Sequence, residues 1–218
     1  MSSFKERCVW NVRIFYALLW REFLIFKSSL KRRLINTFIW TFFLIYVFEF
    51  IGLSSSTGYG LFAGCGECAT QGFYRIFGLA IGLISDIEGP RKISYYLTLP
   101  VSQRLVFLSY AISATIRVII MSLPILFITK IVVGSRFDLT QVSAIKLVAI
   151  FLCVHFFYGS LYLMYAAFTH SIEALRTVRT RFADTLFWTG GFYFTWARLY
   201  AVSPLWAYFD LCNPLIYV

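Results

Sequence analysis

Long apolar runs alternate with short charged segments along this sequence. Runs of about twenty residues suit a bilayer, because a helix rises about 1.5 Å per residue and the hydrocarbon core is about 30 Å thick. A membrane β-barrel would instead show segments in which apolar and polar residues alternate. The pattern predicts an all-α integral membrane protein with about five transmembrane helices. Their predicted positions are about 34–53, 59–84, 105–129, 145–168 and 184–199.

The N-terminal segment, 1–33, differs from these spans, because Lys and Arg side chains are spread along it. Its apolar stretch, 14–26, is broken by Arg21 and Glu22 and would cover roughly 20 Å as a helix, too short for a span. We expect a cytoplasmic amphipathic helix at the inner membrane interface over 1–33. The remainder of the chain, 34–218, would then form the transmembrane domain.

The second predicted span contains six glycines, two pairs of which are four residues apart. The small-xxx-small spacing of Gly60/Gly64 and Gly78/Gly82 lets another helix approach closely. We expect this helix to be buried in the helix bundle or in a subunit interface.

Positive charge is distributed unevenly among the segments that join the spans. The predicted cytoplasmic segments 1–33, 85–104 and 169–183 hold fourteen of the twenty Lys and Arg residues, whereas the outer side holds three. This excess predicts a cytoplasmic N-terminus. With 60% hydrophobic and 14% charged residues, the chain is more apolar than a soluble domain. Because the net charge of +10 flanks the spans, it indicates contact with membrane lipid and no nucleic-acid partner.

Charged residues inside the predicted spans are candidate functional residues, since a charge in lipid is costly. Glu67 and Arg75 share one face of the second span, about 12 Å apart along its axis and too distant to pair directly. Arg117 lies within the third span, where it either lines a transport path or pairs with another helix.

Other reactive side chains occur singly. His155 has no second His or nearby carboxylate, so a hydrogen-bonded packing role is favoured over a proton relay or a metal site. Cys65 and Cys68 form one CxxC pair, a weak metal or redox signal. The sequence lacks a GxxxxGK[ST] phosphate loop and cannot bind ATP through that motif. We expect no catalytic residue, cofactor or metal on this chain.

Three segments carry a resemblance to a known family. The most informative is 85–104, where the acidic turn Asp86-Ile-Glu-Gly89 precedes a Leu97-Thr-Leu-Pro-Val-Ser102 step. The others are LLWREF at 18–23, and GGFYF at 190–194 with NPLIY at 213–217. In this order and spacing they resemble the type-two ABC exporter permeases over essentially the whole chain.

This resemblance implies the membrane subunit of an ATP-driven exporter, with a second permease copy and separate ATPase subunits that bind ATP and Mg²⁺. It also implies a cytoplasmic coupling helix between the second and third spans, which docks on the ATPase and moves with it. An ordinary charged loop is the alternative, and the N-terminal helix either contacts the same ATPase or only anchors to lipid. The candidate ATPase-contact residues are Asp86, Glu88, Gly89, Leu97, Pro100, Ser102, Arg104, Arg21 and Glu22.

The family further implies a re-entrant segment, about 196–218, that would dip into the outer leaflet and gate the exit; a plain outer loop is the alternative. The candidate transport-path or gate residues are Arg117, Glu67, Arg75, Arg198, Pro204, Asn213 and Pro214.

The sequence departs from the family pattern at Pro90, which follows Gly89, and at Gln103, which separates Ser102 from Arg104. Family members continue through a final span, so we expect this chain, which ends at Val218, to lack it. The 20% of aromatic residues favours a polysaccharide, a glycolipid or another amphipathic substrate. A non-transporting assembly protein and an intramembrane lipid-modifying enzyme are the alternative functions. The resemblance implies the bacterial inner membrane.

Overall fold

The computed structural model describes residues 4–51, 59–138, 143–169, 171–192 and 194–217, and the regular structure in them is helical. Val218 and the segment 54–58, between the first two predicted spans, lie outside the described residues. The elements are α1 (Phe4–Tyr46), η1 (Val47–Ile51), α2 (Tyr59–Glu88), α3 (Lys92–Thr98), α4 (Gln103–Val133), η2 (Gly134–Arg136), α5 (Ala144–Phe168), α6 (Ile172–Val178), η3 (Arg179–Ala183), α7 (Asp184–Thr189), α8 (Trp196–Val202), α9 (Pro204–Asp210) and η4 (Pro214–Tyr217).

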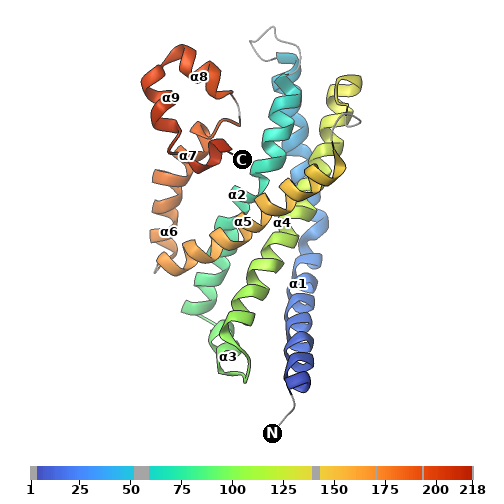
Figure 1. The fold of residues 1–218 in the computed structure, drawn as a ribbon, viewed down its shortest axis with the longest axis vertical. Helices are drawn as coiled ribbons and strands as arrows, with labels where there is room; N and C mark the ends of the chain where they lie inside the picture. Colours follow the sequence, from blue (N-terminus) through green and yellow to red (C-terminus); the bar gives the residue numbers. More distant parts are fainter. Residues whose placement is uncertain (1–3, 52–58, 139–142, 170, 193, 218) are drawn as a thin grey trace.

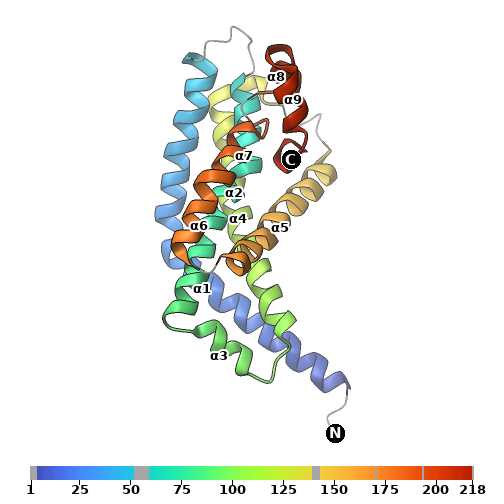
Figure 2. The same ribbon diagram turned by 90° about the vertical axis from the view of Figure 1, so that its left-hand side faces the viewer.

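The long helices alternate in direction along the vertical axis of Figure 1. α1 and α4 rise from the end that carries the N-terminus, whereas α2 and the strongly tilted α5 descend toward it. The short helix α3 lies at this N-terminal end, and α8 and α9 lie at the opposite end (Figures 1 and 2). Three described segments are long and apolar enough to cross a membrane: Val9–Ile51, Gln103–Arg136 and Ala144–Phe168. The predicted all-helical membrane architecture is thus confirmed, and five crossings remain a prediction.

α1 runs through the predicted boundary at residue 33 without interruption. Its 43 residues would extend for about 65 Å at the usual helical rise. The segment 4–46 contains no glycine or proline, so nothing in the local sequence favours a break between an interfacial helix and a span. The N-terminal part of the helix runs at an angle to its upper part in Figure 2.

Two predictions near the C-terminal end are wrong. The segment 169–183, predicted as a loop, is largely helical, because Leu175 and Ala183 are buried against the core while Arg176 and Arg181 are exposed. The predicted span 184–199 is not one helix, because α7 ends at Thr189 before a glycine pair. Gly191 has a φ of 76°, a left-handed conformation that glycine adopts readily.

The main core lies between α2, α4, α5 and α7, and aromatic rings fill much of it. Phe73 stacks on Phe187 at 5.9 Å between ring centroids and meets Tyr158 edge to face at 6.2 Å. Tyr158 reaches α2 where Gly72 leaves room, since a Cβ on that glycine would overlap the Tyr158 ring. α1 packs mainly along α4 and touches α2 much less. A face of α2 is therefore left open toward α1.

A polar groove along α2 and a short helix at its end

Three neighbouring cavities follow the open face of α2. Their volumes are about 670, 850 and 1230 Å³. The first two lie between α1, α2 and α4, and the third lies between α1, α2 and the η3–α7 region. Arg75 and Gly78 each line two of them, so the cavities form one groove.

The polar and glycine residues on the α2 side of this groove form one helical stripe, and Tyr74, Leu79 and Leu83 line the cavities beside it. Its members recur three or four residues apart, the spacing that places side chains on one face of a helix. The stripe consists of Glu67, Gln71, Arg75, Gly78, Gly82 and Asp86. A Cβ added at Gly78 or Gly82 would meet nothing within 4 Å. Among the described residues, no helix makes the predicted close approach at this glycine pair.

Polar side chains form a hydrogen-bonded ladder in the part of the stripe nearer the Tyr59 end of α2. Gln71 Nε2 donates to Glu67 Oε1 at 3.2 Å, and Arg75 Nε donates to Gln71 Oε1 at 2.7 Å. Arg75 Nη2 also donates to Thr37 Oγ1 on α1, at 2.7 Å. The two charged residues thus share one face, as the sequence predicts, and are linked through an amide. Sequence reasoning missed Gln71, although it lies one helical turn from each of them.

An ion pair between α1 and α4 lies further along the groove. Arg117 Nη2 lies 2.5 Å from Glu22 Oε2 and also donates to the Glu22 carbonyl oxygen at 2.9 Å. Both side chains are mostly buried, with exposed fractions of 18% and 14%. The sequence assigned Glu22 to the ATPase contact and Arg117 to the transport path, and the structure joins them.

A second ion pair, which the sequence did not predict, lies at the opposite end of the bundle. The Glu49 carboxylate is 1% exposed and lies 2.6 Å from the exposed guanidinium of Arg136. Its other oxygen accepts the Gly60 backbone N–H at 2.9 Å. Gly60 is required for this approach, since its Cβ would lie 2.6 Å from Glu49 Cβ. Glycine spacing gave a signal for close packing here, but not for its charged partner.

The segment predicted to couple to the ATPase contains the short helix α3. Asp86 Oδ2 accepts the Ile93 backbone N–H at 2.9 Å, so the end of α2 supports the first turn of α3. Ile93 is buried, whereas Tyr95 is 63% exposed on the free side of the helix. Arg21 of α1 lies over the Tyr96 ring at 5.1 Å.

The remaining candidate coupling residues lie around α3. Leu97 is half-buried, and the others are exposed: Glu88, Gly89, Pro100, Ser102 and Arg104. α3 lies at the end of the molecule that carries the N-terminus (Figure 2), and these residues are exposed around it.

The family model described as ABC-2 type transporter matches residues 13–218. The chain belongs to the ABC-2 type transporter family. It is therefore a transmembrane permease component of an ABC transporter, as the resemblance at 85–104 indicated. No curated protein and no solved structure matches the chain.

In this ABC-2 permease chain, the segment 196–217 forms two short helices and a return to α7. Trp196 Nε1 donates to the Ala207 carbonyl at 2.9 Å across the α8–α9 pair. Asn213 is buried, and its amide donates to the Leu186 carbonyl and to Thr189 Oγ1 at 2.7 and 3.0 Å. Asn213 therefore ties this segment back to the bundle. The other candidate gate residues are Arg198, which is exposed, Pro204, which begins α9, and Pro214, which begins η4.

His155 and the cysteine pair of the ABC-2 chain lie in different settings. His155 is buried; its Nδ1 lies 2.7 Å from the Phe151 carbonyl, and its Nε2 lies 2.8 Å from Ser122 Oγ. Because a carbonyl only accepts, Nδ1 is the donor. Cys65 is exposed and Cys68 is buried, with Sγ 3.6 Å from the Ser122 carbonyl. Within the described ranges, no three His, Cys, Asp or Glu residues gather as metal ligands would.

Proposed function

We propose that this ABC-2 chain is the permease subunit of an ATP-driven exporter and that the groove along α2 forms part of its transport path. The observation that carries the proposal is the stripe from Glu67 to Asp86 on α2. Its polar residues line cavities between the helices of a membrane protein. Polar residues at membrane depth face protein or water rather than lipid. A second permease copy would cover the open side of the groove, where Gly78 and Gly82 offer room for a close approach.

The ATPase partner would dock around α3. Asp86 supports this helix from α2, and Arg21 contacts it from α1, so a displacement of α3 would reach both helices that border the groove. ATP and Mg²⁺ would bind to the separate ATPase chains. In this proposal α1, α2, α4, α5 and the contiguous helical segment 172–189 cross the bacterial inner membrane. The N-terminus is cytoplasmic, and the segment 196–217 forms the gate on the outer side. The proposed substrate is a polysaccharide, a glycolipid or another amphipathic molecule.

Co-purification with the ATPase subunit tests the proposal. Glu88→Gln and Arg104→Gln change exposed residues beside α3, and Lys146→Gln neutralises an exposed cation at the opposite end. We expect the first two variants to retain several-fold less ATPase and to lose ATP-driven transport in proteoliposomes, and Lys146→Gln to behave as wild type. If Glu88→Gln and Arg104→Gln retain full coupling, α3 is not the docking site. If the wild-type chain never retains an ATPase, a non-transporting role is favoured.

A further inference from the structure

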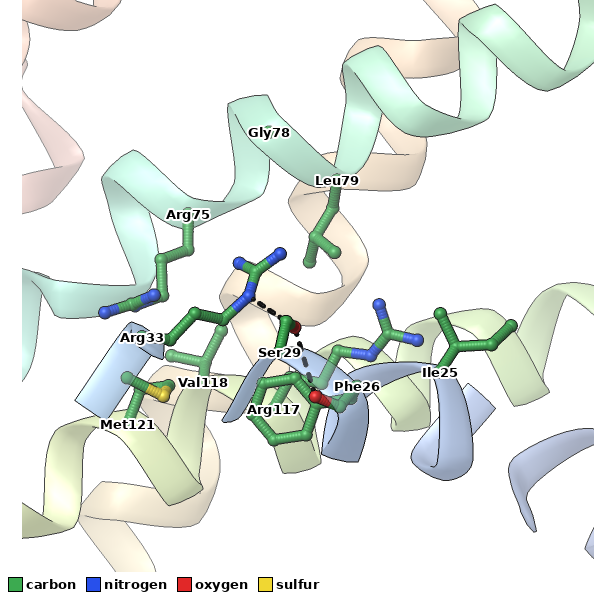
Figure 3. A pocket seen from close by; sticks show the side chains of 10 residues that line it. All are labelled: Ile25, Phe26, Ser29, Arg33, Arg75, Gly78, Leu79, Arg117, Val118 and Met121. Atoms are coloured by element: carbon green, nitrogen blue, oxygen red, sulfur yellow. Dashed lines mark hydrogen bonds between the residues drawn. The ribbon is translucent and has the colours of Figure 1, made fainter. Parts of the chain in front are cut away.

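Three arginines from three helices line the first cavity of the groove. Figure 3 shows Arg33 from α1, Arg75 from α2 and Arg117 from α4 around this space, beside Gly78. No carboxylate of the described chain is among the residues that line it. Three guanidinium groups at one cavity repel one another unless an anion is bound between them.

The polar partners leave most of this charge uncompensated. Arg117 pairs with Glu22, but Arg33 Nε donates to the neutral Ser29 Oγ at 2.9 Å, and Arg75 donates to the neutral Gln71 and Thr37. Among the described residues, neither Arg33 nor Arg75 has an ion-pair partner within 4.0 Å. The two carboxylates on the same stripe line the neighbouring cavities: Glu67 lies beyond Gln71 in the third, and Asp86 lies in the second.

The first cavity lies in the inner part of the proposed membrane-spanning region. The outer end of α2 is at Tyr59, and the outer end of α4 is at Val133. At the usual helical rise, the distance along α2 from Tyr59 to Arg75 and the distance along α4 from Val133 to Arg117 are each about 24 Å. The hydrocarbon core is about 30 Å thick. The arginines therefore lie about 6 Å short of the inner boundary of the hydrocarbon core. A lipid phosphate would enter the groove by about this distance to reach them, and arginine binds phosphate oxygens in a bidentate manner.

An aromatic cavity adjoins the arginines. It shares Arg33 and Arg75 with the first cavity, has the larger volume of about 1230 Å³, and is also lined by Trp40, Tyr74 and Phe187. The charged side chains of Glu67 and Arg179 line it as well. A space that is cationic at one side and aromatic at the other suits an amphiphile with an anionic head and an apolar chain.

We propose that Arg33, Arg75 and Arg117 form a binding site for the phosphate group of a membrane amphiphile, whose apolar chain occupies the aromatic cavity. The inference deepens the proposed function and rests on it, since the amphiphile would be a substrate in the transport groove. Gly78 keeps the site open, because it has no side chain and borders the cavity on α2.

Binding of phosphatidic acid to the full chain, purified with its ATPase partner in phosphatidylcholine nanodiscs, tests the site. Arg33→Gln and Arg75→Gln each remove one cation, and Arg32→Gln is the matched control, an exposed neighbour outside the cavity. We expect Kd to rise about tenfold in each of the first two variants, the loss of one charged hydrogen bond at about 1.4 kcal/mol. Arg32→Gln should leave Kd unchanged. Arg117→Gln is omitted because it also breaks the Glu22 pair.

The same preparation separates the outcomes. Equal losses in Arg32→Gln and Arg33→Gln, or no loss in either cavity variant, would overturn the site. If inorganic phosphate binds as tightly as phosphatidic acid and displaces it, the site takes a free phosphate and the amphiphile is excluded. If the ATPase is retained but Arg33→Gln and Arg75→Gln leave the Kd for phosphatidic acid unchanged, this inference alone is rejected. If the chain binds phosphatidic acid but no ATPase co-purifies with it, the exporter function is rejected.

Discussion

Glu22 and Arg117, far apart in the sequence, form an ion pair that fastens the middle of α1 to the middle of α4. Arg117 also contacts the Phe26 ring, with its guanidinium carbon 5.8 Å from the ring centroid. α1 is exposed along much of its remaining length, so this contact is its principal polar attachment on the side of α3. The pair fixes the distance between two walls of the groove.

We expect Glu22→Gln to lower the free energy of unfolding by about 2–4 kcal/mol, because it leaves a mostly buried guanidinium without its anion. Arg117→Gln should have a similar effect, and the double variant should cost less than the two single changes together. Thermal unfolding in detergent gives the double-mutant cycle. A strictly additive cycle would show that the pair contributes no coupling energy.

Asp86→Ala should loosen α3 without unfolding the bundle. The substitution removes the acceptor of the Ile93 N–H, a loss comparable with a helix cap at about 1 kcal/mol. Hydrogen exchange of α3 should accelerate about fivefold at that energy, whereas Asp86→Asn, which keeps an acceptor oxygen, should be less affected. Ser85→Ala is the control at an exposed neighbour. Unchanged exchange in Asp86→Ala would show that the carboxylate does not order α3.

The glycines of the bundle should fall into two groups. A Cβ at Gly159 would lie 2.6 Å from the Ala111 carbonyl oxygen, so Gly159→Ala must push α5 away from α4. We expect it to destabilise the protein by about 1–3 kcal/mol. Gly78→Ala meets open space and should change the stability of the isolated chain by less than about 1 kcal/mol. Equal melting temperatures for the two variants would contradict the described helix packing.

Asn213→Ala should release the C-terminal segment from α7. The change removes the amide that donates to Leu186, Thr189 and Asp210, and also the acceptor of the Leu215 N–H. Each buried hydrogen bond contributes about 1 kcal/mol. We expect faster proteolysis within the segment 194–212. Asn213→Asp keeps the acceptor and should have an intermediate effect, and Cys212→Ala, at an exposed position, should have none. Equal cleavage of wild type and Asn213→Ala would show that Asn213 does not anchor this segment.

The sequence predicted the long helices well where apolar runs are unbroken. Predicted segments 105–129 and 145–168 correspond to Gln103–Val133 and Ala144–Phe168. The glycine-rich segment at 59–84 also proved to be one helix, Tyr59–Glu88. Prediction failed at 169–183, because three arginines outweighed a buried face that includes Leu175 and Ala183. It also failed at 184–199, where the Gly190–Gly191 pair ends the helix inside an apolar run.

The candidate residues were easier to select than to pair. Intramembrane charge identified Glu67, Arg75 and Arg117 as functional candidates, but hydropathy contains no information on which helices are neighbours in space. Glu22 therefore appeared to belong to the cytoplasmic surface, although Arg117 reaches it from α4. Gln71 and Thr37 escaped notice because a neutral side chain in a span carries no strong sequence signal, even where it orients a charge.

The continuity of α1 gives its length a meaning of its own. One uninterrupted helix carries both Glu22, held by Arg117, and Thr37, held by Arg75. Each added residue turns everything beyond it by about 100°, so a single insertion between them would set the two contacts out of phase. A change of about seven residues would restore the rotation but would displace one contact from the other by about 10.5 Å along the axis, so it would not keep both. The number of residues in α1 between Glu22 and Thr37 is therefore fixed by these two contacts, even where the exposed side chains between them are free to vary.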